Sequence, residues 1–368
     1  MTSITYVGMD VHTTNYTLCA YTLEGQKTFA QTTIHPDINE LVKYLKHLEE
    51  QTGKGVKLVC GYEAGCLGYT LYHQLRSHHY DCTILAPTTM PKTVKAIKTD
   101  KRDAQKIAQC LAYGTYSPVY VPDDEDNAIK EYIRMRDDAQ TMLKQIKQQI
   151  IALCNRHGHI YQGKSRWQPK HMAWLRSLTF NNEVLKETLE EYLVTYSQLK
   201  DKIERYDKRI AEFADREKYA DRVKRLVCLK GVKVHTAMSF IAEIGDFKRF
   251  PTAQQFSAFL GLVPGERSSG NSQHRLGITK TGNSHLRRLL TESANCYSRA
   301  RLGKKSVDLR QRQMGNPTRV IAYADRANDR LRRKYVRIST RSNANIATTA
   351  VARELACLIW GLMNDKLD

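Results

Sequence analysis

Four acidic residues occupy positions that suit metal-assisted chemistry on a phosphate. Asp10 and Glu63 each end an apolar run, and Asp100 and Asp103 lie three residues apart in KTDKRDA. Crowded carboxylates raise one another's pKa unless a cation neutralises them, and oxygen ligands suit Mg²⁺ or Mn²⁺. Such ions can activate an attacking oxygen and stabilise a leaving one. The set therefore predicts a divalent-metal site for phosphodiester chemistry.

The elements around these acids decide whether they meet. Hydrophobic patterning predicts strands at 4–10, 16–22, 27–34, 56–63 and 81–87, and helices near 38–51, 67–78 and 101–113. Three antiparallel strands followed by alternating helices and strands is the order of the ribonuclease H fold, in which strands one and four are neighbours. Asp10 and Glu63 would then converge, with Asp100 and Asp103 on one helix face. Taken singly, Asp103 could instead cap a helix and Glu63 could be a surface charge.

A second segment whose residues could do chemistry reads GLVPGERSSGNSQHRLGITKTGNSHLRRLL, residues 261–290. Its glycines predict a loop, and Asn283 or Ser284 could cap the basic helix that follows. A serine in this loop could attack a phosphodiester while cations hold the phosphate. The candidate cations are Arg267, Arg275, Lys280, Arg287 and Arg288. The alternative is a Ser/Gly loop that only contacts phosphate.

Residues 222–250 contain two short helical patterns joined at 230–234. They resemble a helix-hairpin-helix, whose tight turn aims backbone N–H groups at a phosphate. Lys230 and Lys233 flank the single glycine, Gly231, and are candidate phosphate contacts. A plain helical hairpin within a core is the alternative.

Between these regions the chain predicts two long helices with near-heptad apolar spacing, the second over 185–213. We expect an antiparallel coiled coil, with amphipathic helices packed on a neighbouring domain as the alternative. Residues 155–182 would form the loop at its tip, because Pro169 breaks any helix there. The expected organisation is α/β plus α, with parts at 1–122, 123–218 and 219–368.

The charge of the chain favours a polyanionic partner. Lys and Arg number 58 against 38 Asp and Glu, a net charge of +20, and residues 261–368 hold 21 of the former and 8 of the latter. Counterion release from phosphates makes nucleic acid the leading candidate, although a solvated basic surface is possible. The cysteines and histidines lack zinc spacing. With no secretion signal and no stretch of membrane-spanning length, we expect a cytoplasmic protein.

The carboxylates together with further motifs resemble a known family. TDKRDA, AEIGDFKRF, AFLGLVP, the Ser-Gly pair at 269–270 and ITKTGNSHLRRLL are similar to the DEDD transposases of insertion-sequence family one-ten. The likeness extends over nearly the whole chain. It implies a RuvC-like N-terminal domain, a coiled coil and a mainly helical transposase domain.

The resemblance also implies roles for residues. Asp10, Glu63, Asp100 and Asp103 would hold Mg²⁺, with Mn²⁺ possible, and Ser269 would form a covalent 5′-phosphoserine link to cleaved DNA. Ser268 and Ser272 are neighbouring alternatives. Such recombinases act on donor and target DNA under the guidance of a bridge RNA. They assemble as dimers or tetramers in which the RuvC-like domain of one protomer meets the transposase domain of another.

Two other functions compete with this one. A metal-dependent nuclease of the Holliday-junction resolvase type would use water as the nucleophile and Ser269 only as a phosphate contact. A non-catalytic nucleic-acid-binding protein would use the basic C-terminal part alone, and its acidic residues would be dispensable.

Overall fold

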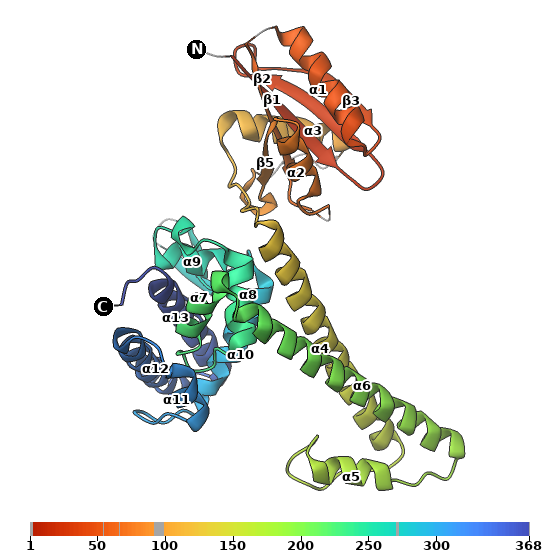
Figure 1. Ribbon diagram of the computed structural model, residues 1–368, viewed down its shortest axis with the longest axis vertical. Helices are drawn as coiled ribbons and strands as arrows, with labels where there is room; N and C mark the ends of the chain where they lie inside the picture. The colour runs from red at the N-terminus through yellow and green to blue at the C-terminus, as the bar shows by residue number, and fades with distance from the viewer. Residues whose placement is uncertain (1–2, 54, 66, 92–98, 270–271, 368) are drawn as a thin grey trace. The chain divides into compact units, whose positions relative to one another are not determined.

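A computed structural model describes residues 3–53, 55–65, 67–91, 99–269 and 272–367. The side chains of Thr88 and of residues 267–275 are not described. The chain divides into two compact units, Met1–Val121 and Pro122–Asp368. Each unit is described by itself below (Figure 1).

The N-terminal unit is built on a five-stranded mixed sheet in the order β3-β2-β1-β4-β5. Its strands are β1 (Ile4–Val11), β2 (Tyr16–Thr22), β3 (Lys27–Ile34), β4 (Lys57–Glu63) and β5 (Asp81–Leu85). β1, β2 and β3 pair antiparallel, whereas β4 is parallel to β1 and β5 is parallel to β4. This confirms the ribonuclease H-like fold, with β1 and β4 side by side.

Helices cover both faces of this sheet. α1 (Ile38–Thr52) and α2 (Thr70–Ser77) pack in one hydrophobic core with Val7 and Met9 of β1. α3 (Asp100–Tyr113) packs with Tyr6 in a separate cluster. Successive side chains of a strand point to opposite faces, so the even-numbered positions of β1, Asp10 among them, belong to the α3 face.

Two glycines let α3 approach the sheet closely. A Cβ atom on Gly8 would lie 2.1 Å from the Ala104 carbonyl oxygen and 2.3 Å from the Ala108 nitrogen. A Cβ on Gly61 of β4 would lie 2.8 Å from a Leu111 methyl carbon. The backbone of β1 therefore touches that of α3, which fixes the position of the helix over the strand ends.

The second unit begins with two long helices, α4 (Asp124–Arg156) and α6 (Glu183–Ala214), which run antiparallel along each other (Figure 1). Leu143 and Ile150 of α4 pack with Leu189 and Tyr196 of α6 in the core between them. The expectation that Pro169 breaks any helix is wrong, because α5 (Pro169–Ser177) begins at this residue. Proline is compatible with the first position of a helix, where its missing N–H has no intrahelical partner. The coiled coil stays a prediction.

The rest of the unit is mainly helical, as expected. Its helices are α7 (Glu217–Leu226), α8 (Val234–Ile244), η2 (Phe247–Arg249), α9 (Ala253–Phe259), α10 (Ser284–Ala294), η3 (Asn295–Ser298), α11 (Val307–Gln313), α12 (Thr318–Ser339) and α13 (Ala344–Met363). One hydrophobic core joins them to the start of α4 and the end of α6 through residues such as Ile133 and Ile210. The three-part division of the chain stays a proposal, since the long helices share this core.

The loop expected between Gly261 and the basic helix is corrected by a β-hairpin, β6 (Pro264–Ser269) and β7 (Ser272–Ile278), whereas the basic helix itself is present as α10. The strands pair antiparallel, with Ser269 opposite Ser272. A Gly-Asn pair between two short runs is a hairpin signal, and it outweighs the loop-forming composition of the segment.

The expectation that no stretch reaches membrane-spanning length is also corrected. α13 is long and apolar enough to cross a membrane by length and composition. However, Val351, Leu355, Ile359 and Leu362 are fully buried in the hydrophobic core of the unit. The apolar character of α13 is therefore accounted for by its place as a central core helix.

Candidate functional site

Asp10, His12 and Asp100 form a cluster at the edge of the N-terminal sheet. Each offers one ligand atom, and these atoms all lie within 4.8 Å of one another. His12 Nε2 is 3.3 Å from Asp10 Oδ2. Carboxylate oxygens and an imidazole nitrogen can together hold a divalent ion. Sequence reasoning missed His12, although its position two residues after Asp10 on an extended segment was a signal.

The close packing of β1 on α3 brings Asp10 and Asp100 together. Asp10 follows Gly8 on the α3 face of β1, and Asp100 and Asp103 lie in the first turn of α3. Thr99 is the N-cap residue of this helix, so Asp103 is not the cap. Partial positive charge at a helix N-terminus favours carboxylates there.

The electrostatics of the cluster favour uptake of a cation. Burial raises the pKa of Asp10, and the negative charges of Asp100 and Asp103 raise it further, whereas His12 opposes the shift. A divalent cation would relieve the repulsion between these carboxylates. The donor set and its electrostatics thus fit a divalent metal.

Glu63 and Asp103 stand outside this group of three ligand atoms. Glu63 is the last residue of β4, and the parallel register that pairs Met9 with Tyr62 places it beside Asp10 on the adjacent strand. It shares a strand face with Gly61, which lies against α3. Among the described residues, the structure therefore brings Asp10 and Asp100 into ligand distance, with Asp103 and Glu63 at the same sheet edge.

The predicted nucleophile lies in the second unit, at the end of β6. Ser269 is the last residue of that strand, Ser268 is paired with Gln273, and Ser272 begins β7. The side chains of Arg267, Ser268, Ser269, Ser272 and Arg275 lie outside what the structure describes. Their assigned roles therefore stay predictions.

The base of the hairpin is fixed by tight backbone contacts. A Cβ on Gly282 would lie 1.9 Å from the Phe259 carbonyl oxygen, and Gly282 has a φ of +71°. The Arg287 guanidinium donates hydrogen bonds to the carbonyls of Leu260 and Thr281, each at 2.9 Å. Asn283 caps α10 by accepting a hydrogen bond from the Leu286 N–H. Arg287 thus holds backbone together as well as adding positive charge.

A partly buried group of side chains from α4, α8 and α10 forms what we call the acid–histidine network: Asp137, His235, Glu243 and His285. His285 Nε2 is 2.6 Å from Asp137 Oδ2, and His285 Nδ1 is 2.9 Å from Glu243 Oε1. Carboxylates only accept hydrogen bonds, so His285 donates from both nitrogens and is positively charged. His235 Nε2 lies 3.0 Å from Asp137 Oδ1 but outside hydrogen-bond geometry.

The pKa values in this network follow from its pairing. Burial alone would lower the pKa of His285, but its hydrogen bonds to Asp137 and Glu243 raise it to about 9. Burial opposes ionisation of Glu243, yet His285 and Arg134 lower its pKa to about 2. The pKa of Asp137 is also lowered well below its usual range, by His235 and His285 against the effect of burial. Sequence reasoning missed this network, whose one signal is Asp137 interrupting the apolar spacing of α4 after Ile133.

The remaining residues that the sequence predicts to contact nucleic acid differ in how far they are exposed or already paired within the protein. Lys280 and Lys233 are exposed. Arg288 pairs with Asp137 at 2.6 Å and with Glu292 at 3.0 Å. The Lys230 N–H donates to Asn328, and its carbonyl accepts from the Tyr297 hydroxyl. The turn between α7 and α8 is therefore fastened to the core through Lys230.

Comparisons with known proteins agree with this architecture. Residues 223–308 match a family model described as the transposase IS116/IS110/IS902 family, and residues 7–158 match a model of IS110 DEDD transposases. A putative transposase y4qE of Sinorhizobium fredii is 36% identical over 321 residues, covering 86% of this chain and 78% of the relative. The transposase for insertion sequence element IS1533 of Leptospira borgpetersenii is 31% identical over 339 residues, covering 90% and 95%.

Proposed function

Since the chain belongs to the IS110 family of DEDD transposases, we propose that it cuts and rejoins DNA through a covalent link between Ser269 and a 5′-phosphate. The observation that carries the proposal is the convergence of Asp10 and Asp100 at one sheet edge, in the part of the chain that matches the DEDD model. A DEDD domain implies a divalent metal, and we propose Mg²⁺, with Mn²⁺ as a substitute.

The chemistry of the proposed step conserves the phosphodiester energy. The Ser269 hydroxyl oxygen forms a bond to phosphorus, the bond from phosphorus to the 3′-oxygen breaks, and that oxygen takes up a proton as the serine hydroxyl loses one. A divalent ion held by Asp10, Asp100 and their neighbours would supply positive charge to offset the charge that develops on these oxygens. A 3′-hydroxyl of a second strand can then attack the phosphoserine and release the enzyme.

The partners of this reaction are proposed from the family and from charge. DNA binding follows from transposase activity, and the net charge of +20 supports further contacts with phosphates. We propose that a bridge RNA guides the choice of DNA. We also propose a dimer or tetramer in which the acidic cluster of one protomer serves the serine of another.

A denaturing gel tests the covalent link. DNA labelled at the 3′ end of the cleaved strand, which stays with the fragment that carries the new 5′-phosphate, is incubated with the protein and its guide RNA, then denatured and separated. We expect a band of DNA attached to protein, present in Ser268→Ala and Ser272→Ala and absent in Ser269→Ala. Free 5′-phosphate ends made by the unchanged protein would instead favour the resolvase-type nuclease, in which water attacks.

A second result separates catalysis from simple binding. Under the proposal, Asp10→Asn and Asp103→Asn abolish strand exchange while DNA binding persists. A non-catalytic nucleic-acid-binding protein would retain every activity after these substitutions.

A further inference from the structure

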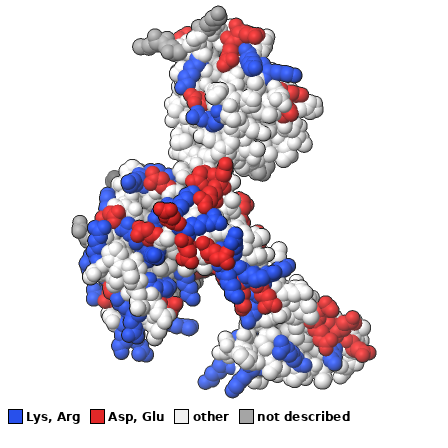
Figure 2. All heavy atoms as spheres, in the orientation of Figure 1, with Lys and Arg blue, Asp and Glu red and all other residues white. Residues whose placement is uncertain are grey.

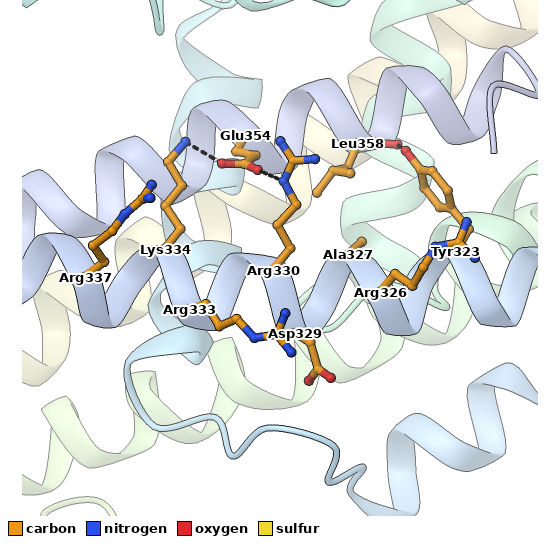
Figure 3. A pocket seen from close by; sticks show the side chains of 10 residues that line it. All are labelled: Tyr323, Arg326, Ala327, Asp329, Arg330, Arg333, Lys334, Arg337, Glu354 and Leu358. Carbon is orange, nitrogen blue, oxygen red and sulfur yellow. Dashed lines mark hydrogen bonds and ion pairs between the residues drawn. The ribbon is translucent and has the colours of Figure 1, made fainter. Parts of the chain in front are cut away.

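One exposed face of α12 carries a row of cations beside a cavity of about 760 Å³ (Figure 3). The row consists of Arg326, Arg330, Arg333, Lys334 and Arg337. Steps of three and four residues keep these side chains on one helix face, about one 5.4 Å turn apart. The face is therefore a basic stripe several turns long, and we call it the α12 groove.

The neighbouring acids hold part of this stripe in place without neutralising it. Glu354 of α13 is buried and pairs with both Arg330 and Lys334. Asp329 accepts a hydrogen bond from the Gly303 N–H, at 3.0 Å. Five cations therefore face two carboxylates in the groove, which leaves a local excess of positive charge.

Two arginines of the groove are available to a partner. Arg333 and Arg337 are exposed, and within the described chain their guanidinium groups have no hydrogen bond or ion pair. Lys and Arg side chains gather where Figure 1 places α11 and α12 (Figure 2). The groove is thus part of a wider basic surface.

The shape and lining of the groove indicate what kind of anion it fits. A stripe of cations at one-turn intervals matches a chain of phosphates better than a single small anion. Proteins that hold single strands usually offer aromatic faces on which bases stack. The aromatic residue of the groove, Tyr323, is buried and donates its hydroxyl to the Leu358 carbonyl at 2.9 Å. The lining therefore suits the backbone of a duplex.

We propose that the α12 groove binds the phosphodiester backbone of duplex DNA, with Arg333 and Arg337 as its main contacts. The proposal rests on the proposed strand-exchange function and adds to it a surface that holds duplex DNA without taking part in the chemistry. Contacts of this kind position a duplex without reading its sequence.

Duplex binding measured without cleavage tests the proposal. The full chain carrying Arg333→Gln and Arg337→Gln is compared with one carrying Lys202→Gln and Lys208→Gln, a pair on exposed positions of α6. Affinity for two DNA duplexes of unrelated sequence is measured in EDTA over a range of salt concentrations. We expect the groove variant to lose roughly tenfold in affinity for both duplexes, with a log–log salt slope shallower by about 2. The α6 variant should match the unchanged protein.

Two controls and two contrary outcomes make the result decisive. Melting temperatures of the two variants equal to that of the unchanged protein show that both are folded. Equal DNA affinities and salt slopes for the two variants would overturn the proposal. A duplex RNA is measured in the same way, and a loss of affinity for RNA alone would also overturn it. Ser269→Ala should keep full duplex binding while forming no covalent adduct, which separates failure of the groove from failure of the serine chemistry.

Discussion

His285 Nε2 and Asp137 Oδ2 lie 2.6 Å apart, although 148 residues separate them in the sequence. The contact joins the first turn of α10 to the long helix α4. Asn283, the cap of α10, also binds Glu243 of α8. The helix that follows the serine hairpin is therefore held on two sides by buried charge.

This network makes the stability of the second unit depend on pH. His285 is protonated up to about pH 9 when folded but only to about 6.5 when unfolded, so its stabilising effect is complete below about pH 6.5 and lost as pH rises through 9. Asp137 and Glu243 act oppositely, since their contribution is present above about pH 4 and fades as pH falls toward 2 for Glu243. Urea unfolding at pH 5–10 should show the free energy of unfolding falling by about 3 kcal/mol between about pH 6.5 and pH 9. His285→Gln should flatten that fall, whereas His157→Gln, at an exposed position, should not.

The contact between Gly8 and α3 predicts that a methyl group there disrupts the acidic cluster. In Gly8→Ala the new Cβ meets backbone atoms of Ala104 and Ala108, so α3 must move away from β1. We expect the N-terminal unit to lose about 1–3 kcal/mol in unfolding free energy and its divalent-ion binding to weaken. Thermal unfolding with and without Mn²⁺ measures both effects. Gly25→Ala is the control, because its Cβ would meet only the Lys27 side chain, at 3.6 Å; equal behaviour of the two variants contradicts the prediction.

The membership of His12 in the cluster predicts a difference between metals. Imidazole nitrogen is a better ligand for Mn²⁺ than for Mg²⁺, which prefers oxygen and retained water. His12→Ala should therefore reduce the Mn²⁺-induced rise in melting temperature more than the Mg²⁺-induced rise, whereas Asp100→Asn should reduce both. Glu50→Gln, at an exposed position on α1, should change neither. A uniform loss for both metals in His12→Ala would show that His12 acts only through Asp10.

Substitutions of Arg287 and Lys280 should have different effects, because Arg287 supports the backbone at the base of the hairpin whereas Lys280 is exposed and could contact nucleic acid. Because Arg287 bonds two carbonyls at the base of the hairpin, Arg287→Gln should lower the melting temperature and the yield of covalent adduct. Lys280 is exposed, so Lys280→Gln should weaken DNA binding and leave the melting temperature unchanged. Calorimetry and DNA-binding isotherms on both variants check this prediction. Equal changes in melting temperature and in DNA affinity for the two variants would contradict it.

Much of the fold could be predicted because its signals are local. Alternation of apolar residues marks β1 to β5, and their order alone indicates the ribonuclease H topology that places Asp10 beside Glu63. The hairpin of β6 and β7 was missed because its Ser- and Gly-rich strands lack such alternation. Helix α5 was missed because Pro169 was weighed as a breaker and not as a first residue.

The site could be predicted only in part. Asp10 and Asp100 lie at the ends of elements whose positions follow from the topology of the sheet. The sequence could therefore predict that their side chains lie close together. The acid–histidine network was not, since its members come from α4, α8 and α10 and meet only through tertiary packing. Local spacing carries no information about contacts made over such separations.

The place of α13 at the centre of its core also orders events during synthesis. The N-terminal unit ends at Val121, so all of its strands and helices are synthesised before those of the second unit. The C-terminal unit lacks its central apolar helix until Met363 has emerged from the ribosome. The nascent chain can thus complete the N-terminal fold well before the unit that carries Ser269 can close, which delays completion of that second unit until α13 has been synthesised.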